Sequence, residues 1–170
     1  NMRKAGDGPR LTEMSLHKWA RDDNPTVYKE ILDANILEYI RRFVDATHFH
    51  IARLMKKLYG NNYVASLTEK TTDWFFYDDT INLWKQLSQG IQLRKNISFE
   101  VADYIGKARE KIRDDMGKNA KTDDERALYV TKIDKLLKVE TQLYNSGFTD
   151  SVMKMAATFF FEEDFRDKLN

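Results

Sequence analysis

The sequence contains no cysteine, and this absence excludes two kinds of site at once. Without thiols the chain forms no disulfide and offers no thiolate ligand to zinc, so a reducing, intracellular compartment is its natural setting. Only two prolines and seven glycines interrupt 170 residues, which favours long helices over many short strands. No apolar run approaches the roughly 18 residues that a membrane-spanning helix needs, so we expect no membrane association.

Motifs for nucleotide chemistry are also missing. A P-loop needs G-x-x-x-x-G-K-[ST], whose backbone amides cradle phosphate, and no such run occurs. The pair Gly6 and Gly8 lies in a polar lead-in with no strand before it, so it does not make a dinucleotide fingerprint. We therefore predict that this fragment is not an enzyme and holds no cofactor of its own.

Histidine is scarce, and its spacing does not suit a metal. His48 and His50 are two residues apart, whereas two ligands on one helix face need a spacing of three or four. Asp78 and Asp79 precede a threonine in a predicted turn, and adjacent strand residues point to opposite faces. The acidic run 162–164 is typical of a solvated helix face. We predict no metal site and no catalytic residue.

Most of the chain has the apolar spacing of helices. Residues 1–10 are a polar, flexible lead-in, of which Asn1 and Met2 are an expression remnant, and residues 11–170 form one helical domain. Ser15 is expected to cap the first helix, Pro25 to open the second, and Thr122 or Asp123 to cap a long later one. Apolar positions three or four apart predict a buried face in each helix. The later members of this expected core are Tyr129, Ile133, Leu136, Leu137, Leu143, Tyr144, Val152, Met155, Ala156, Phe159 and Phe160.

The middle of the chain differs in kind. Residues 63–67, 73–77 and 83–87 are short, aromatic-rich runs separated by polar turn residues. This pattern predicts a three-stranded antiparallel meander over about residues 63–87, with Trp74, Phe76 and Trp84 at least partly in the core. The predicted fold class is mainly α, a multi-helix bundle with this small β meander inserted.

Basic residues are concentrated just after the meander. The segment 85–121 holds nine basic and five acidic residues, a charge of +4 in a chain whose net charge is +1. Cations beside aromatic rings can hold phosphates and stack bases. The alternative is an ordinary solvated helix with Lys107–Asp103 and Lys111–Asp115 pairs. The candidate DNA-binding residues are Trp84, Arg94, Lys95, Lys107, Lys111 and Lys118, with Arg109 and Arg113 on a neighbouring face.

Several blocks, taken in their order, resemble one family. The sequence is similar to the helical domain that precedes the superfamily-three helicase core in primase–helicases of poxvirus type and of giant viruses, with relatives in phages and plasmids. The most specific block is Trp74-Phe75-Phe76-Tyr77, then Trp84, then Gly90 to Leu93 and Ile97-Ser98. The other blocks are Gly8 to Thr12, Ser15 to Ala20, Asp23-Asn24-Pro25, Ile51-Ala52, Leu58 to Asn61, Tyr63-Val64 and Phe165 to Asn170.

The resemblance implies a role for the domain rather than for single residues. The parent protein would be a ring-forming, ATP- and Mg-dependent viral DNA helicase with a primase upstream, and this domain would connect the two and help to assemble the ring or guide DNA. The fragment alone would be a monomer, since closing a ring needs the helicase core. The alternative is an assembly module that never contacts DNA. In either case the basic middle and the acidic residues Glu162 and Glu163 could form the two unlike patches of a ring interface.

Overall fold

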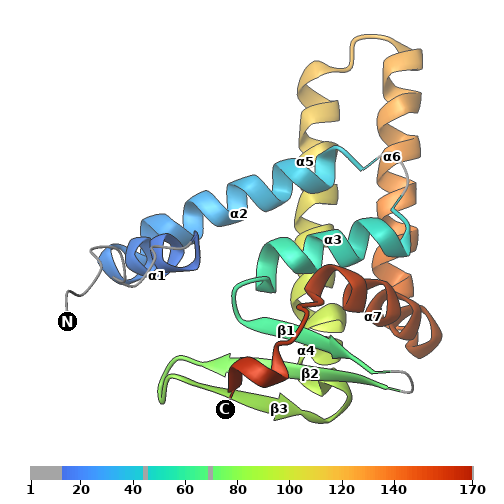
Figure 1. Cartoon of the computed structure of the whole chain (residues 1–170). Coiled ribbons are helices and arrows are strands. Elements are labelled where there is room, and N and C mark those ends of the chain that lie inside the picture. The colour runs from blue at the N-terminus through green and yellow to red at the C-terminus, as the bar shows by residue number, and fades with distance from the viewer. Residues whose placement is uncertain (1–12, 44–45, 69–70, 170) are drawn as a thin grey trace, which may run out of the picture. The chain divides into compact units, whose positions relative to one another are not determined.

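The computed structural model describes residues 13–43, 46–68 and 71–169, and Figure 1 shows the helices and strands that they form. Contacts divide the chain into two compact units, residues 1–35 and 36–170, and the boundary falls inside the second helix. The predicted lead-in 1–10 lies outside the described residues. The chain is mainly helical with one small antiparallel sheet, which confirms the predicted fold class. No helix within the described ranges is long and apolar enough to cross a membrane.

The first unit holds α1 (Glu13–Asp23) and the start of α2 (Pro25–Arg41). Pro25 opens α2 as predicted, and the side-chain oxygen of Asn24 accepts a hydrogen bond from the Val27 amide at 3.1 Å. The prediction for Ser15 is wrong, because Ser15 lies inside α1 rather than before it.

The sheet has the predicted strands with small changes at their ends. Strands β1 (Tyr63–Leu67), β2 (Thr72–Asp78) and β3 (Leu83–Leu87) pair antiparallel in the order β1-β2-β3. Because side chains alternate, Trp74 and Phe76 point to one face and Phe75 and Tyr77 to the other. Trp74 is 3% exposed and Phe76 and Trp84 are half-buried, which confirms that all three are at least partly in the core.

Helices cover the first face of the sheet. Helix α3 (His48–Tyr59) packs along α7 (Ser146–Phe160), and α7 also contacts β1. The rings of Trp74 and Phe160 meet edge to face at 5.5 Å between centroids. The helices therefore bury the apolar side of the strands that hold the aromatic block.

The end of the chain covers the second face. Phe165 is 5% exposed and packs with Val64 and Phe75, and the half-buried Trp84 lies against this cluster. The guanidinium of Arg166 pairs with the Asp73 carboxylate on β2. Just before, Phe161 forms a parallel bridge with Ala65, whose carbonyl accepts a hydrogen bond from the Glu162 amide at 3.2 Å. The charged residues that follow Phe165 form a short 3-10 turn, Arg166–Leu169.

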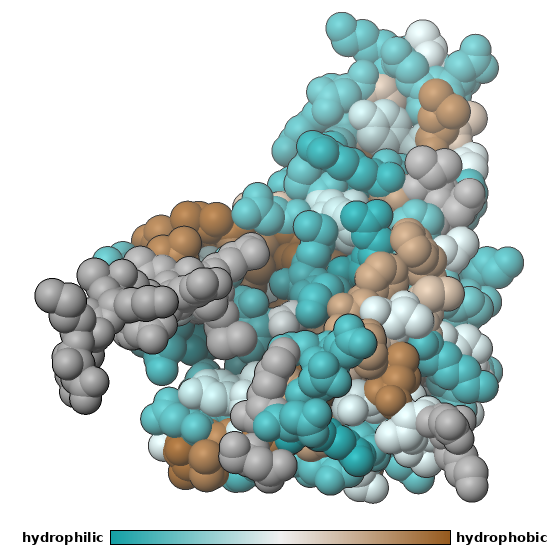
Figure 2. Space-filling model, viewed as in Figure 1, coloured by the Kyte–Doolittle hydropathy of each residue, from teal (hydrophilic) through white to brown (hydrophobic). Residues whose placement is uncertain are grey.

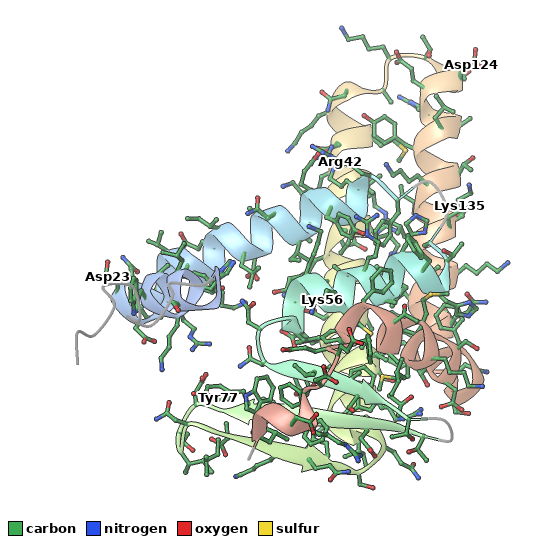
Figure 3. The ribbon with its side chains drawn as sticks, in the orientation of Figure 1. Asp23, Arg42, Lys56, Tyr77, Asp124 and Lys135 are labelled. Atoms are coloured by element: carbon green, nitrogen blue, oxygen red, sulfur yellow. The ribbon has the colours of Figure 1, made fainter. Side chains whose placement is uncertain are left out.

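A long helical hairpin follows the sheet. Helix α4 (Ile91–Asn96) continues through a π-helical turn, η2 (Ile97–Val101), into α5 (Ala102–Asn119), and α6 (Asp123–Gln142) returns antiparallel beside it (Figure 1). Thr122 caps α6 as predicted, in a reciprocal capping box with Glu125. Figure 3 shows Asp124 at the far end of this hairpin.

Some positions predicted to be buried are not. Leu137 on α6 is 47% exposed and Met155 on α7 is 37% exposed, because each helix buries a narrower stripe than its apolar residues span, and Tyr144 is 66% exposed in the turn between the two helices. Met153 takes the inward position of α7 instead, at 3% exposure. Ser146 and Gly147, a pair that favours the end of a helix, instead lie at the start of α7, which Asn145 caps.

Candidate nucleic-acid interface

Two of the six candidate residues follow the strand β3 and lie on α4. The Nε of Arg94 donates a hydrogen bond to the Gln89 carbonyl at 3.1 Å, and its guanidinium forms an ion pair with Asp150 on α7. Arg94 therefore fastens α4 to α7, and its charge is matched within the chain. Lys95 is exposed. Because it is the next residue along the helix, its side chain points in a different direction from that of Arg94.

The third candidate, Trp84, belongs to the packing of the sheet. Its ring lies 5.2 Å from that of Tyr77 and meets the Phe165 ring edge to face at 4.9 Å, centroid to centroid. A base stacks on an exposed ring face, whereas Trp84 is half-buried and packs its ring against side chains of its own chain. Packing within the chain thus accounts for a tryptophan at position 84.

The remaining three candidates, Lys107, Lys111 and Lys118, are exposed on α5. Lys107 forms the predicted pair with Asp103, at 2.6 Å between Nζ and Oδ2. The predicted pair between Lys111 and Asp115 is wrong. Asp115 instead lies 2.7 Å from the Nη2 of Arg41, an ion pair without hydrogen-bond geometry.

The arginines on the neighbouring face of α5 bind carboxylates of the chain itself. The Nε of Arg109 donates to Glu140 on α6 at 3.1 Å, and this guanidinium is only 16% exposed. Arg113 donates to both carboxylate oxygens of Glu110, one turn earlier. Arg109 ties α5 to α6 and Arg113 pairs within α5, so the lysines carry what remains of the predicted phosphate track.

A group of tyrosines around one carboxylate escaped the sequence analysis. The hydroxyl of Tyr59 on α3 donates to Glu100 in the π-helical turn at 2.7 Å. Burial, then the bond to Glu100 and the charges nearby, raise the pKa of Tyr59 well above its usual range. Burial and Glu100 also raise the pKa of Tyr63. Both hydroxyls therefore remain protonated and can donate hydrogen bonds.

No pattern in the sequence predicted the π-helical turn. The amide of Ala102 donates to the carbonyl of Ile97, five residues earlier, where an α-helix would use a spacing of four. Within this turn the hydroxyl of Ser98 donates to the Leu143 carbonyl at 2.8 Å. Phe99 lies between the two anchored residues Ser98 and Glu100 and is 67% exposed. Such turns inside helices are frequent at functional sites.

His48, His50 and Asp78 have local partners. The Nδ1 of His50 lies 2.9 Å from the Thr47 hydroxyl at the start of α3, and the His48 ring packs on Phe148 at 4.4 Å between centroids. Asp78 accepts hydrogen bonds from Thr80 and Lys85. No group of three or more His, Asp or Glu side chains in the described part of the chain is arranged to hold a metal ion.

The first unit carries an apolar groove between α1 and α2. Its lining includes Leu16, Val27 and Ile31, which are 57%, 45% and 58% exposed, and Tyr28, whose hydroxyl contacts His17 at 3.1 Å. Figure 2 shows hydrophobic atoms at the surface of these helices, whereas the outer part of the α5–α6 hairpin is mainly hydrophilic in the same view.

Comparison with known proteins adds no family to this geometry. No protein-family model matches the sequence, and no curated protein matches it either. The function therefore has to be argued from the residues and the structure.

Proposed function

We propose that this chain is a non-catalytic helical domain of a viral DNA primase–helicase, which connects the primase to the ATP-driven helicase and contributes to ring assembly, to DNA guidance or to both. Its partners would be DNA, the adjacent primase and helicase domains, and other copies of the full protein in a ring, within an infected cell. ATP and Mg would belong to the parent helicase. The order and spacing of the blocks quoted above are the sequence support for this proposal.

One structural observation supports it most. The block that resembles the last residues before a helicase core, Phe165 onward, packs on the block that is most specific in the resemblance. Phe165 contacts Phe75 at 5.2 Å and Trp84 at 4.9 Å between ring centroids, and Arg166 pairs with Asp73. A connector has to set the direction in which the next domain leaves it, and a flexible tether cannot do so. Anchoring at the exit is the property that such a role requires.

DNA guidance and pure assembly make different demands on the surface. Arg94 and Lys107 are paired within the chain and Trp84 is packed, so three of the six candidate residues are already occupied. Lys95, Lys111 and Lys118 remain for phosphate. An assembly role is favoured by the exposed apolar residues of the first unit, of which Trp19 is 54% exposed.

The test measures both properties on the same preparation. Fluorescence anisotropy with labelled single-stranded and forked DNA, at low and moderate salt, reports DNA binding, and sedimentation reports self-association. Binding that weakens as salt rises supports DNA guidance, because released counterions drive phosphate contacts. A monomer that binds no DNA at low salt and does not enhance the assembly of a helicase core joined to residue 169 would contradict the proposal.

A further inference from the structure

We propose that one exposed helix face, running from α4 through the π-helical turn into α5, is a single-stranded DNA track on which Phe99 stacks a base and Lys95, Lys107, Lys111 and Lys118 hold phosphates. We name it the α4–α5 stripe. The inference rests on the proposed function and specifies its DNA-guidance part. It differs from the sequence prediction in its stacking residue, which is Phe99 and not Trp84.

The stripe is continuous along the helix surface. Its members follow one another at a spacing of four residues, and every one of them is exposed. Ile91 and Phe99 are the most exposed apolar members, each at 67%. The successive positions are Ile91, Lys95, Phe99, Asp103, Lys107 and Lys111, with Lys118 two turns further on.

The π-helical turn is what keeps these positions on one side. In an uninterrupted α-helix each residue turns by about 100°, so Lys95 and Lys107 would point about 120° apart. The turn at 97–101 accommodates one extra residue, since the Ala102 amide reaches back to Ile97. The later residues are thereby rotated back by about 100°, which leaves the two lysines within about 20° of each other. The irregularity therefore brings the lysine of α4 into line with those of α5.

Phe99 is held in place from both sides. Ser98 donates to the Leu143 carbonyl at 2.8 Å, and Glu100 accepts from the Tyr59 hydroxyl at 2.7 Å. Both partners are buried: Leu143, at the C-terminal cap of α6, is 0% exposed, and Tyr59, on α3, is 8% exposed. The backbone on either side of Phe99 is thus fixed while its ring faces solvent. An aromatic ring presented in this way stacks a base with little loss of conformational entropy.

The charges of the stripe favour a polyanion. Among the described residues, no side chain forms an ion pair with Lys95, Lys111 or Lys118, and the pair of Lys107 is with the exposed Asp103. Asp114 and Glu100 are also exposed near the row, so its four lysines outnumber these three carboxylates by one. Lys95 lies one helical turn before Phe99 and the other lysines lie after it, so a single strand that stacks one base on Phe99 can meet lysines on both sides of that base.

The test compares matched variants for binding labelled oligothymidylate by anisotropy over a range of salt. We expect Phe99→Ala to weaken binding by about 5- to 100-fold with an unchanged salt dependence, since a stacked base is lost but no phosphate contact. Lys95→Ala should weaken binding and reduce the slope of log affinity against log salt by about 0.7. Phe161→Ala and Lys138→Ala, at exposed positions outside the stripe, are the controls and should bind as the unmodified chain does.

A second variant separates stacking from simple apolar contact. Phe99→Trp should retain binding, and its added fluorescence, measured as the difference from the unmodified chain, should be quenched by the oligonucleotide. Circular dichroism verifies that each variant is folded. If the chain binds DNA but Phe99→Ala and Lys95→Ala bind as tightly as the controls, the stripe is wrong while DNA guidance stands. If the chain binds no DNA at low salt, DNA guidance and the stripe fail together, and the assembly role remains.

Discussion

Tyr59 and Glu100, 41 residues apart, are joined by a hydrogen bond of 2.7 Å that links α3 to the π-helical turn. The tyrosine ring is 8% exposed, so its hydroxyl has few other partners. This single contact holds the irregular part of the long helix against the helical layer that covers the sheet.

Replacement of Tyr59 by phenylalanine should lower the free energy of unfolding by about 1–2 kcal/mol, because a bond to a carboxylate is lost while the ring packing stays. Urea unfolding at neutral pH measures the change.

The same variant, Tyr59→Phe, also tests how stability depends on pH. Since the folded state raises the pKa of Tyr59, its contribution is complete below the unfolded pKa of about 10 and is lost as pH rises beyond it. The decline of stability above pH ~10 should therefore be shallower in Tyr59→Phe, and an equal decline in both proteins would contradict this.

The Asp78 carboxylate should titrate far below its ordinary range. The bond from Lys85, at 2.7 Å, and those from Thr80 lower the pKa of Asp78 to about 2. A depressed carboxyl pKa stabilises the fold above the unfolded value of about 3.9, and the effect is lost as pH falls through 2. NMR titration of the side-chain carboxyl should give a midpoint near 2 and a higher midpoint in Lys85→Met. An unchanged midpoint in that variant would show that Lys85 does not set it.

Gly90 should not tolerate alanine. Its φ is +62°, and an added Cβ would lie 2.8 Å from the Met153 Cε and 3.0 Å from the Trp74 ring. Strain and overlap together should lower the free energy of unfolding by about 2–4 kcal/mol. Gly117→Ala is the control, since a Cβ there meets nothing within 4 Å, and it should stabilise the helix by about 0.5–1 kcal/mol. Thermal unfolding of the two variants should shift in opposite directions.

Truncation of Phe165 should release the end of the chain from the sheet. Phe165→Ala removes the ring that packs on Phe75 and Trp84, and we expect a loss of about 3 kcal/mol and a red shift of the Trp84 fluorescence. Leu169→Ala, at a side chain that is 39% exposed, should have little effect. Unchanged emission in Phe165→Ala would mean that the end of the chain does not shield Trp84.

The meander was predictable because its information is local. Apolar side chains are concentrated in residues 63–67 and 83–87, and polar turn residues separate these runs. Strands β1 and β3 have these predicted first and last residues. The capping of α6 by Thr122 was equally local. The ion pair of Arg94 and Asp150, in contrast, joins residues 56 positions apart, and no local sequence pattern predicts it. The π-helical turn is unannounced too, because its stabilising partners, Tyr59 and Leu143, come from distant helices. Lysines could be proposed from charge, but which of them stay unpaired depends on the tertiary fold.

The position of Phe165 has a consequence for the order in which the chain folds during synthesis. Strands β1 to β3 are complete once Leu87 has left the ribosome, yet the second face of their sheet has no cover until residues 161–165 emerge. For nearly eighty residues of elongation, about 4–16 s at ordinary synthesis rates, Val64 and Phe75 are left to water or to a chaperone. A segment made later thus protects a surface of strands that were made well before it.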